Sequence, residues 1–170
     1  MTSAPVYSCG ILTLSDKGSR GEREDTSGAI LKEIMAEAGF EITAYAIIPD
    51  KLELIRQTLI EWADIRELDL IITTGGTGIS PTDVTPEATA RIIDRELPGI
   101  SEAMRMASFK ITPHAVLSRG RSGIRGRCLI INLPGSKKAA QENIRTVLEA
   151  LPHAIYKIKG GMDDCAQNSN

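Results

Sequence analysis

The sequence predicts a single α/β domain built around a mostly parallel sheet, and three observations support this fold class. Four apolar runs are too continuous for a sheet with one solvated face and too short for most helices, which is typical of strands covered on both faces. Segments with helical periodicity separate these runs, so strands and helices alternate along the chain. The 170 residues, 42% of them hydrophobic and 25% charged, suffice for one core.

The four apolar runs are the expected strands. They comprise residues 6–14 (VYSCGILTL), 42–49 (ITAYAIIP), 68–74 (LDLIITT) and 127–134 (RCLIINLP). Two helices are expected between the first three strands, because apolar residues recur there at helical spacing. Their stripes consist of Ile30, Leu31, Ile34 and Met35, ended by Gly39, and of Ile55, Leu59 and Trp62.

Two further helices are expected from their capping residues. Thr85 is expected to cap one helix, with Pro86 at its first position and Glu87 in the first turn, where the helix dipole favours a carboxylate. Ser136 is expected to cap the other. The inward residues of this last helix are Ala140, Ile144, Val147, Leu148 and Leu151.

The remaining segments interrupt this alternation. Residues 114–133 contain two short apolar runs around a Gly- and Arg-rich middle, which we interpret as a small hairpin arm entering the last strand. Met104, Met106 and Phe109 are interpreted as helix packing rather than a cofactor site. Residues 1–160 are expected to form the domain, and the polar residues 161–170 a loose tail.

The composition argues against several classes of protein. A formal net charge of −2 and a pI near 5.8 argue against a nucleic-acid-binding surface. No apolar run approaches the length of a membrane span, and residues 1–10 lack the pattern of a leader. Cys9, Cys128 and Cys165 form no close pair that would indicate a disulfide framework or a zinc site. We therefore expect a cytoplasmic protein with neither nucleic acid nor membrane as partner.

Polar and Gly-rich segments follow all four expected strands. They read SDKGSRGEREDTSG, PDK, GGTGISPTD and NLPGSKK. The carboxyl ends of parallel strands meet at one edge of a sheet, where ligands of open α/β folds usually bind. The sequence therefore predicts a ligand site at this edge.

The GGTG segment after the third strand suits phosphate binding, because glycines let backbone N–H groups approach an anion closely. A plain tight turn is an equally good interpretation of these four residues alone. The segment is neither a P-loop nor a dinucleotide fingerprint, and no lysine follows it.

Asp50 and Asp83 lie at two of these strand exits and are candidate Mg²⁺ ligands. Mg²⁺ typically binds one or two carboxylates together with substrate oxygens, and it would offset the repulsion between carboxylates and a phosphate. The alternatives are that Asp50 caps the following helix and that Asp83 caps its own loop.

Basic residues on the same loops could neutralise a phosphate-bearing ligand. They are Lys17, Arg20, Arg119, Arg121, Arg125, Lys137 and Lys138, and we expect only a minority to contact ligand. His114 and His153 have no companion at metal-ligand spacing, and Ser118 has no evident histidine partner, which argues against a hydrolase triad.

Four motifs together are more specific than any one loop: IIPD, LIITTGGTGISPTDVTPEAT, ITPHAVLSR and GIRGRCLIINLPGS. With them the chain, from about Tyr7 to Gly160, resembles the molybdopterin adenylyltransferases of molybdenum cofactor biosynthesis, including the corresponding domain of gephyrin. The resemblance implies a three-layer α/β/α fold and a homotrimer. It also implies a reaction in which molybdopterin and Mg-ATP give adenylylated molybdopterin and pyrophosphate.

The resemblance further implies which residues form the site. Asp50 and Asp83 are implied to be catalytic and to hold Mg²⁺. Residues assigned to substrate or nucleotide binding are Ser15, Asp16, Thr74, Gly75, Gly76, Thr77, Gly78, Ser108, Ser118, Pro134, Gly135 and Ser136. Thr82 departs from the family, whose members often carry a basic residue before the second aspartate, so one phosphate contact is either absent or supplied by Lys17 or Arg20.

Two other functions remain open. The protein could bind or carry molybdopterin without catalysis, although the two aspartates weigh against this, or it could be a nucleotide pyrophosphatase on a related domain. The product of an adenylyltransferase would pass to a molybdate-inserting partner.

Overall fold

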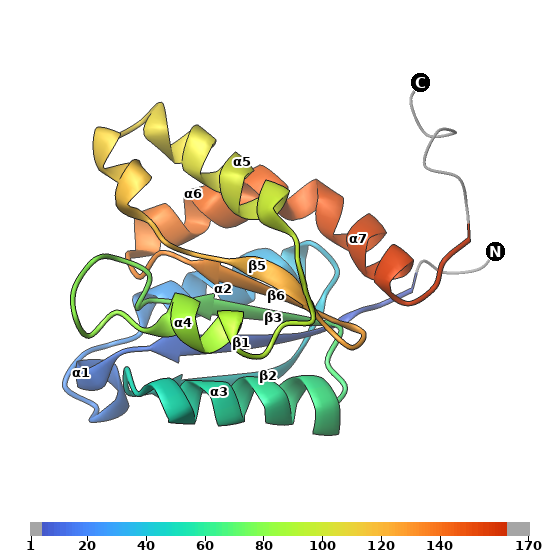
Figure 1. Cartoon of the computed structure of the whole chain (residues 1–170), viewed down its shortest axis with the longest axis horizontal. Coiled ribbons are helices and arrows are strands. Elements are labelled where there is room, and N and C mark those ends of the chain that lie inside the picture. The colour runs from blue at the N-terminus through green and yellow to red at the C-terminus, as the bar shows by residue number, and fades with distance from the viewer. Residues whose placement is uncertain (1–4, 163–170) are drawn as a thin grey trace.

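The computed structural model describes residues 5–162, which form a three-layer α/β/α domain around a six-stranded sheet (Figure 1). The strands lie in the order β2-β1-β3-β6-β5-β4. Four are parallel: β1 (Ser8–Leu14), β2 (Glu41–Ile48), β3 (Leu70–Thr74) and β6 (Cys128–Leu133). Two antiparallel strands, β5 (Ser122–Arg125) and β4 (Arg95–Glu96), complete one edge. The predicted fold class is confirmed.

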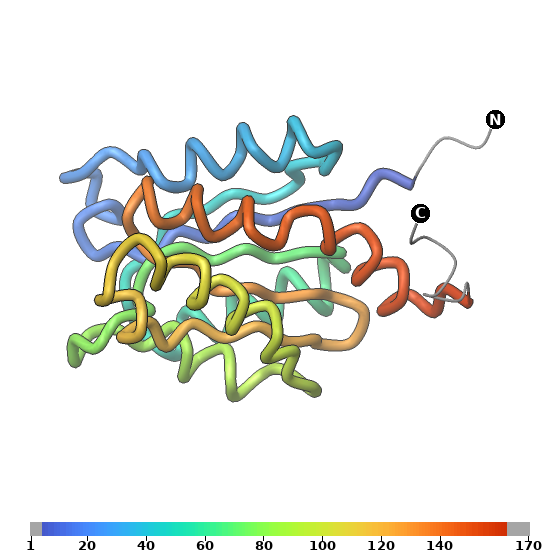
Figure 2. The backbone as a smooth tube through the Cα atoms, turned by 90° about the horizontal axis from the view of Figure 1, so that it is seen from above, coloured from blue at the N-terminus to red at the C-terminus, as the bar shows by residue number. Residues whose placement is uncertain are grey.

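Helices cover both faces of the sheet. One layer contains α2 (Thr26–Glu37), α5 (Pro98–Phe109), α6 (Lys137–Val147), η3 (Leu148–Ala150) and α7 (Leu151–Ile158). Figure 2 shows α2, α6 and α5 side by side above the sheet. The opposite layer contains α3 (Leu52–Ile60), η1 (Glu61–Ile65) and α4 (Thr85–Ala90), whereas α1 (Asp16–Ser19) and η2 (Pro113–Leu117) lie among the loops.

Each face of the sheet carries its own hydrophobic core, which explains the continuous apolar runs. On β3, Leu70 and Ile72 pack into the core under α2, α6 and α7, whereas Ile71 between them packs into the core over α3 and α4. All three side chains are fully buried. Successive side chains of a strand point to opposite faces, so a strand between two layers needs apolar residues at every position.

Several local expectations are confirmed. Ser136 caps α6 by accepting a hydrogen bond from Ala139 N (3.3 Å), and Gly39 follows the end of α2 with φ of 86°. A hairpin enters the last strand as predicted and turns at Gly126, but its first arm is β5, within the Gly- and Arg-rich middle.

Three expectations are wrong. Thr85 does not cap α4: it is buried, and its hydroxyl donates to Gly75 O (3.0 Å) instead. The apolar run before the hairpin forms η2 rather than a strand, because Pro113 begins a 3₁₀ turn there. Met106 and Phe109 do not pack in the core, since only Met104 of that group is buried.

The two ends of the described chain, near residues 5 and 162, lie at the end of the sheet opposite to the carboxyl ends of the parallel strands (Figure 1). The predicted tail falls largely on residues 163–170 and, with Cys165, lies outside the described residues. Within residues 5–162, no helix has the length and apolar character needed to cross a membrane.

Candidate active site

Two adjoining cavities lie at the carboxyl edge of the sheet. The first cavity, of about 600 Å³, is lined by the exits of β1, β2, β3 and β6 and by the start of α2. The second, of about 510 Å³, lies among the glycine loop, the end of α5, η2 and α6. Gly76, Asp83 and Gly135 line both cavities, so these residues mark the junction.

The glycine loop is held in a conformation that requires glycine. Gly75 and Gly76 have φ of 103° and 64°, which disfavours any residue with a side chain. A Cβ atom on Gly76 would lie 2.3 Å from Thr85 Oγ1 and 2.8 Å from Asp50 Oδ1. The backbone thus lies directly against Asp50. Gly75 N donates to Leu133 O (3.1 Å), so this N–H is already used and does not face an anion as expected.

Asp50 is the most unusual carboxylate of the site. Its Oδ1 atom is buried and has no hydrogen-bond partner among the described residues. Burial raises the pKa of the Asp50 carboxyl, and the nearby carboxylates of Asp16 and Asp83 raise it further. The capping alternative is wrong, because the N-cap of α3 is Lys51 and no side chain caps that helix.

Asp83 caps its own loop, which was the alternative interpretation of this residue. Its Oδ2 atom accepts a hydrogen bond from Ser80 N (2.8 Å), and Asp83 N donates to Ser80 O (2.9 Å). Gly78 leaves room for this carboxylate, since a Cβ there would lie 2.9 Å from Asp83 Oδ2. These bonds fix the shape of the loop that carries Asp83, which lines both cavities.

The donor set fits Mg²⁺ bound together with a substrate. No group of three or more His, Cys, Asp and Glu side chains within residues 5–162 is arranged to hold a metal on its own. A cation between Asp50 and Asp83 would satisfy the orphaned Asp50 oxygen and reduce the repulsion among the carboxylates. Substrate phosphates would have to complete its coordination.

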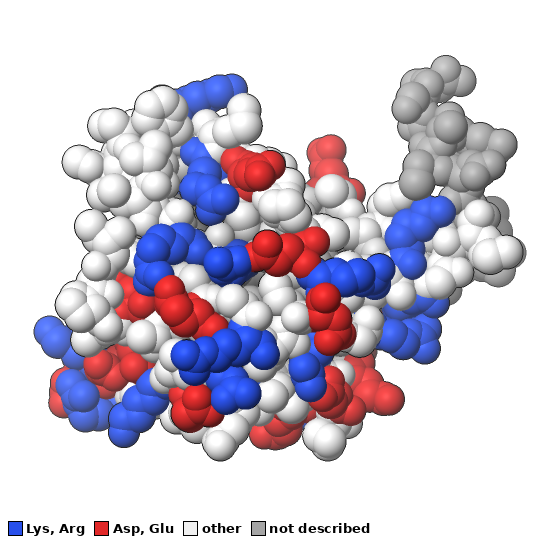
Figure 3. All heavy atoms as spheres, in the orientation of Figure 1, with Lys and Arg blue, Asp and Glu red and all other residues white. Residues whose placement is uncertain are grey.

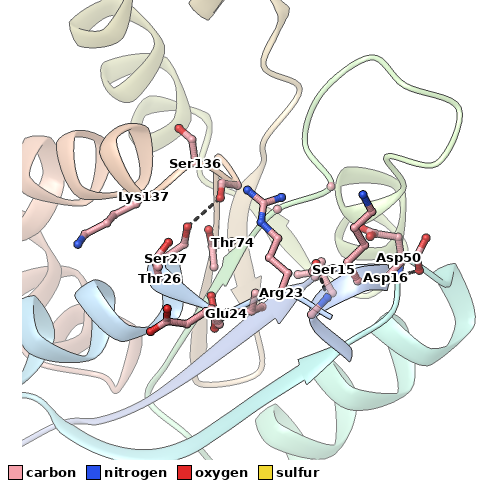
Figure 4. A pocket seen from close by; sticks show the side chains of 18 of the residues that line it. Ser15, Asp16, Arg23, Glu24, Thr26, Ser27, Asp50, Thr74, Ser136 and Lys137 are labelled. Atoms are coloured by element: carbon pink, nitrogen blue, oxygen red, sulfur yellow. Dashed lines mark hydrogen bonds between the residues drawn. The ribbon is translucent and has the colours of Figure 1, made fainter. Parts of the chain in front are cut away.

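Three basic side chains line the first cavity: Lys17, Arg23 and Lys137. Figure 4 shows Asp16 and Asp50 at one end, Ser27 and Lys137 at the other, and Arg23 between them. Arg23 was missed, because the charged run around it reads as ordinary surface.

Most of the other basic candidates are engaged elsewhere. Arg119, Arg121 and Arg125 form ion pairs with Glu87, Glu96 and Asp64. Arg20 pairs with Glu22, and Lys138 lies 3.9 Å from Glu142. The sequence did not indicate which of these basic side chains would form ion pairs within the protein.

The start of α2 forms one wall of the first cavity and was also missed. Asp25 caps α2 by accepting from Gly28 N (2.8 Å), and it accepts from Thr13 Oγ1 and Tyr45 OH (both 2.6 Å). Burial and the bond to Asp25 raise the pKa of Tyr45. Ser27 Oγ donates to Gly135 O (2.8 Å) and so ties α2 to the junction. Asp25 is a residue type that commonly caps helices and it precedes the apolar stripe of α2, so the sequence did contain a signal for this helix start.

The second cavity contains polar groups held by neighbouring elements. Asn143 Nδ2 donates to Ser108 Oγ (2.9 Å), which fixes α6 against the end of α5. Arg105 donates to Gly120 O (3.0 Å) while it lines the cavity. Asn143 and Arg105 were not predicted, since a residue on an amphipathic helix gives no sign of which cavity it borders.

Every site residue assigned from the sequence lines one of the two cavities. The first cavity contains Ser15, Asp16, Asp50, Thr74, Gly75 and Ser136, and the second contains Thr77, Gly78, Ser108, Ser118 and Pro134. The remaining three, Gly76, Asp83 and Gly135, border both. Their roles stay predictions, but the structure brings them together.

Comparison with known proteins identifies the domain. A family model described as "Probable molybdopterin binding domain" matches residues 10–153. The chain is 42% identical over 153 residues to the molybdopterin adenylyltransferase of Helicobacter pylori strain J99, with 89% of this chain and 87% of that protein covered. It is 47% identical over 156 residues to gephyrin of Dictyostelium discoideum, covering 86% of this chain but 22% of gephyrin.

Similar solved structures also come from proteins of molybdopterin biosynthesis. The molybdopterin biosynthesis enzyme MoaB from Thermus thermophilus superimposes with a TM-score of 0.87 at 51% identity, with 91% of this chain and 98% of that one covered. The family resemblance read from the four motifs is confirmed: the chain belongs to the molybdopterin-binding domain family of molybdenum cofactor biosynthesis.

Proposed function

We propose that the protein is an enzyme of molybdenum cofactor biosynthesis that transfers AMP from Mg-ATP to the terminal phosphate of molybdopterin. An oxygen of the pterin phosphate attacks the α-phosphorus of ATP, and pyrophosphate leaves. The observation that carries this proposal is the pair of adjoining cavities that share Gly76, Asp83 and Gly135. Two phosphate-bearing substrates in separate cavities would meet at that junction.

The residues of the site suit a reaction between two anions, in which positioning and charge neutralisation dominate. Bound Mg²⁺ would be held by Asp50 and Asp83 and would stabilise charge on the triphosphate. Lys17, Arg23 and Lys137 would offset further negative charge in the first cavity. No protein nucleophile is needed, which agrees with the lack of a hydrolase triad in the sequence.

The second cavity would hold the pterin. Ser108, Ser118 and Asn143 line it and would bond a polar heterocycle, and Ile79 and Leu117, also in the lining, would supply apolar contact. The first cavity would hold the nucleotide, with the glycine loop and Ser136 on its phosphate side.

The assembly and partners belong to the same proposal. A homotrimer follows from the family resemblance, and exposed apolar side chains on α5 supply surface for an assembly to cover. A molybdate-inserting protein would receive the adenylylated product. Cys9 and Cys128 are free and buried, which suits a reducing cytoplasm.

One experiment separates this function from its alternatives. The protein is incubated with molybdopterin, ATP and Mg²⁺, and adenylylated pterin and pyrophosphate are measured. We expect both products in equal amounts. Pterin binding without either product would indicate a carrier. Hydrolysis of ADP-ribose in a parallel incubation without pterin would indicate a pyrophosphatase.

A further inference from the structure

The Arg119 side chain bonds to both ends of the loop that carries Asp83. Its Nε donates to Gly78 O (2.7 Å) and its Nη2 donates to Asp83 O (2.7 Å). Its Nη1 donates to Glu87 Oε1 on α4. Its backbone N donates to Thr77 O (2.9 Å). One residue from the segment that leads into β5 therefore binds the loop of residues 78–83 at its first and last positions.

Burial does little to hold this loop in place. Ile79, its one large apolar residue, is 67% exposed, and residues 79–82 are all exposed. The bonds between Ser80 and Asp83 lie within the loop and fix its shape but not its position relative to the sheet. A loop with few buried contacts opens at low free energy unless hydrogen bonds tie it to the domain. The bonds from Arg119 are of this kind.

Glu87 orients the guanidinium. Its Oε1 atom accepts from Arg119, and its Oε2 atom is buried with no partner within the described part of the chain. A partly desolvated carboxylate favours a fixed cation beside it. The planar guanidinium can serve this carboxylate and two carbonyl groups at once, which a lysine ammonium on a flexible stem cannot do in the same geometry.

We propose that Arg119 is a positioning residue, which fixes the loop of residues 78–83 so that the Asp83 carboxylate stays at the junction of the two cavities. Its catalytic consequence rests on the proposed function. Arg119 itself lines neither of the two cavities. It acts through Asp83.

Hydrogen exchange of the ligand-free protein tests the structural part. Arg119→Lys keeps the positive charge but loses the planar guanidinium that bonds Gly78 O and Asp83 O together. The amides of residues 79–83 are therefore expected to exchange about tenfold faster than in the parent. Arg121→Lys is the matched control: the Arg121 guanidinium also pairs with a glutamate, Glu96, and within the described residues it forms no hydrogen bond to this loop. The control is expected to leave exchange of the loop unchanged.

Kinetics test the consequence. In Arg119→Lys, kcat is expected to fall about 10- to 100-fold, as when a catalytic group is misplaced by about 1 Å, while the KM for molybdopterin changes little. Added guanidinium is expected to restore part of the kcat of Arg119→Ala but not of Asp83→Asn, which a merely structural role of Arg119 would not produce.

Parental exchange and parental kcat in Arg119→Lys would overturn the proposal, as would equal effects in Arg121→Lys. If the parent protein transfers no adenylyl group, the proposed function fails. The exchange comparison then still decides whether Arg119 holds the loop.

Discussion

The partly buried Asp50 carboxylate is destabilising in the protein without ligand, and we propose that a cation bound with the substrate relieves this. The carboxylate has a buried oxygen without a partner among residues 5–162 and lies near two other carboxylates, of Asp16 and Asp83. Such a group is retained at an energetic cost, because burial and like charges both disfavour its ionised form. A cation that binds with the substrate would remove that cost at the moment of binding.

Asp50→Asn is therefore expected to separate activity from stability. Adenylyl transfer should fall by about two or more powers of ten, since the amide is a poorer Mg²⁺ ligand and carries no charge. The free energy of unfolding without ligand should change by less than about 1 kcal/mol, in the stabilising direction because a repulsive charge is removed. Pyrophosphate release across a magnesium titration and thermal melts measure the two effects.

A second site variant and a control variant complete this experiment. Asp83→Asn should lose activity similarly, and Asp94→Asn should not, because Asp94 bonds to Gly126 N outside both cavities (2.7 Å). Near-parental rates in both site variants would refute the metal role. Activity lost only in step with unfolding would return the aspartates to structural roles.

The pKa of Asp69 shifts in the direction opposite to that of Asp50. Burial opposes its ionisation, but bonds from Lys159, Ser8 N (2.9 Å) and Ser8 Oγ (3.1 Å) outweigh burial and hold the pKa of Asp69 below its ordinary value. A depressed pKa in the folded state means that the stabilisation is present above the unfolded value of about 3.9 and is lost as pH falls through the folded pKa.

Asp69→Asn should accordingly lower the free energy of unfolding by about 1.5 to 3 kcal/mol at pH 7, the range of hydrogen bonds to a charged group. The difference from the parent should shrink as the pH is lowered from about 5 towards 2. Urea unfolding at several pH values checks this. A difference that is constant with pH would show that ionisation of Asp69 contributes nothing.

The place of a single residue in the site was predictable from the sequence only where its position relative to a strand end determines that place. Asp50 and Asp83 follow strands, and strand ends meet at one edge, so their convergence needed no coordinates. Arg119 is different: its three acceptors come from residues 78, 83 and 87, and nothing in a run of arginines and glycines indicates which carbonyl groups a guanidinium will reach.

At the scale of elements, the connection from β3 to α4 carries the site. Thr85 looked like a helix cap from its position before Pro86 and Glu87, but its hydroxyl donates to Gly75 O and its N–H donates to Gly76 O (3.2 Å). Tertiary contact overrode local capping preference, because the buried hydroxyl needs a partner and the glycine loop supplies one. Similarly, β4 has two residues and no alternation for a sequence pattern to reveal.

Gly76→Val is expected to abolish tight binding of nucleotide or molybdopterin. A branched side chain at φ of 64° is strained, and its Cβ would collide with Thr85 Oγ1 and Asp50 Oδ1. Gly126→Val is the matched control, because Gly126 has φ of 55° but open space around it. Backbone strain should cost both variants about 1 to 3 kcal/mol of stability, and the collision should cost Gly76→Val more. Calorimetry should show lost binding in Gly76→Val only; if both ligands bind it as tightly as the parent, the loop is a plain turn.

At the scale of the whole molecule, charge and apolar surface are segregated. Figure 3 shows acidic and basic side chains interspersed over the lower part of this face, whereas the upper left part, over η2 and the adjoining end of α5, is mostly uncharged. Exposed apolar side chains there include Met106 (68%), Phe109 (54%) and Val116 (61%). The sequence pattern placed Met106 and Phe109 in the core, because an apolar helical stripe does not distinguish a core from an assembly surface.

The mass in solution is expected to be about three times the single-chain 18.4 kDa. Light scattering at micromolar concentration, coupled to size exclusion, measures it directly. A mass near that of one chain would contradict the proposed trimer and leave the apolar surface over α5 without an occupant.

Both ends of the described chain lie at the opposite end of the sheet from the site. An anchor or reporter attached through either end would therefore leave the mouths of both cavities facing bulk solvent. The protein can be tethered to a sensor chip and its nucleotide and pterin titrated over it without the surface blocking entry. The same geometry lets the domain be joined to larger polypeptides from that side, as a module whose working edge points away from the joint.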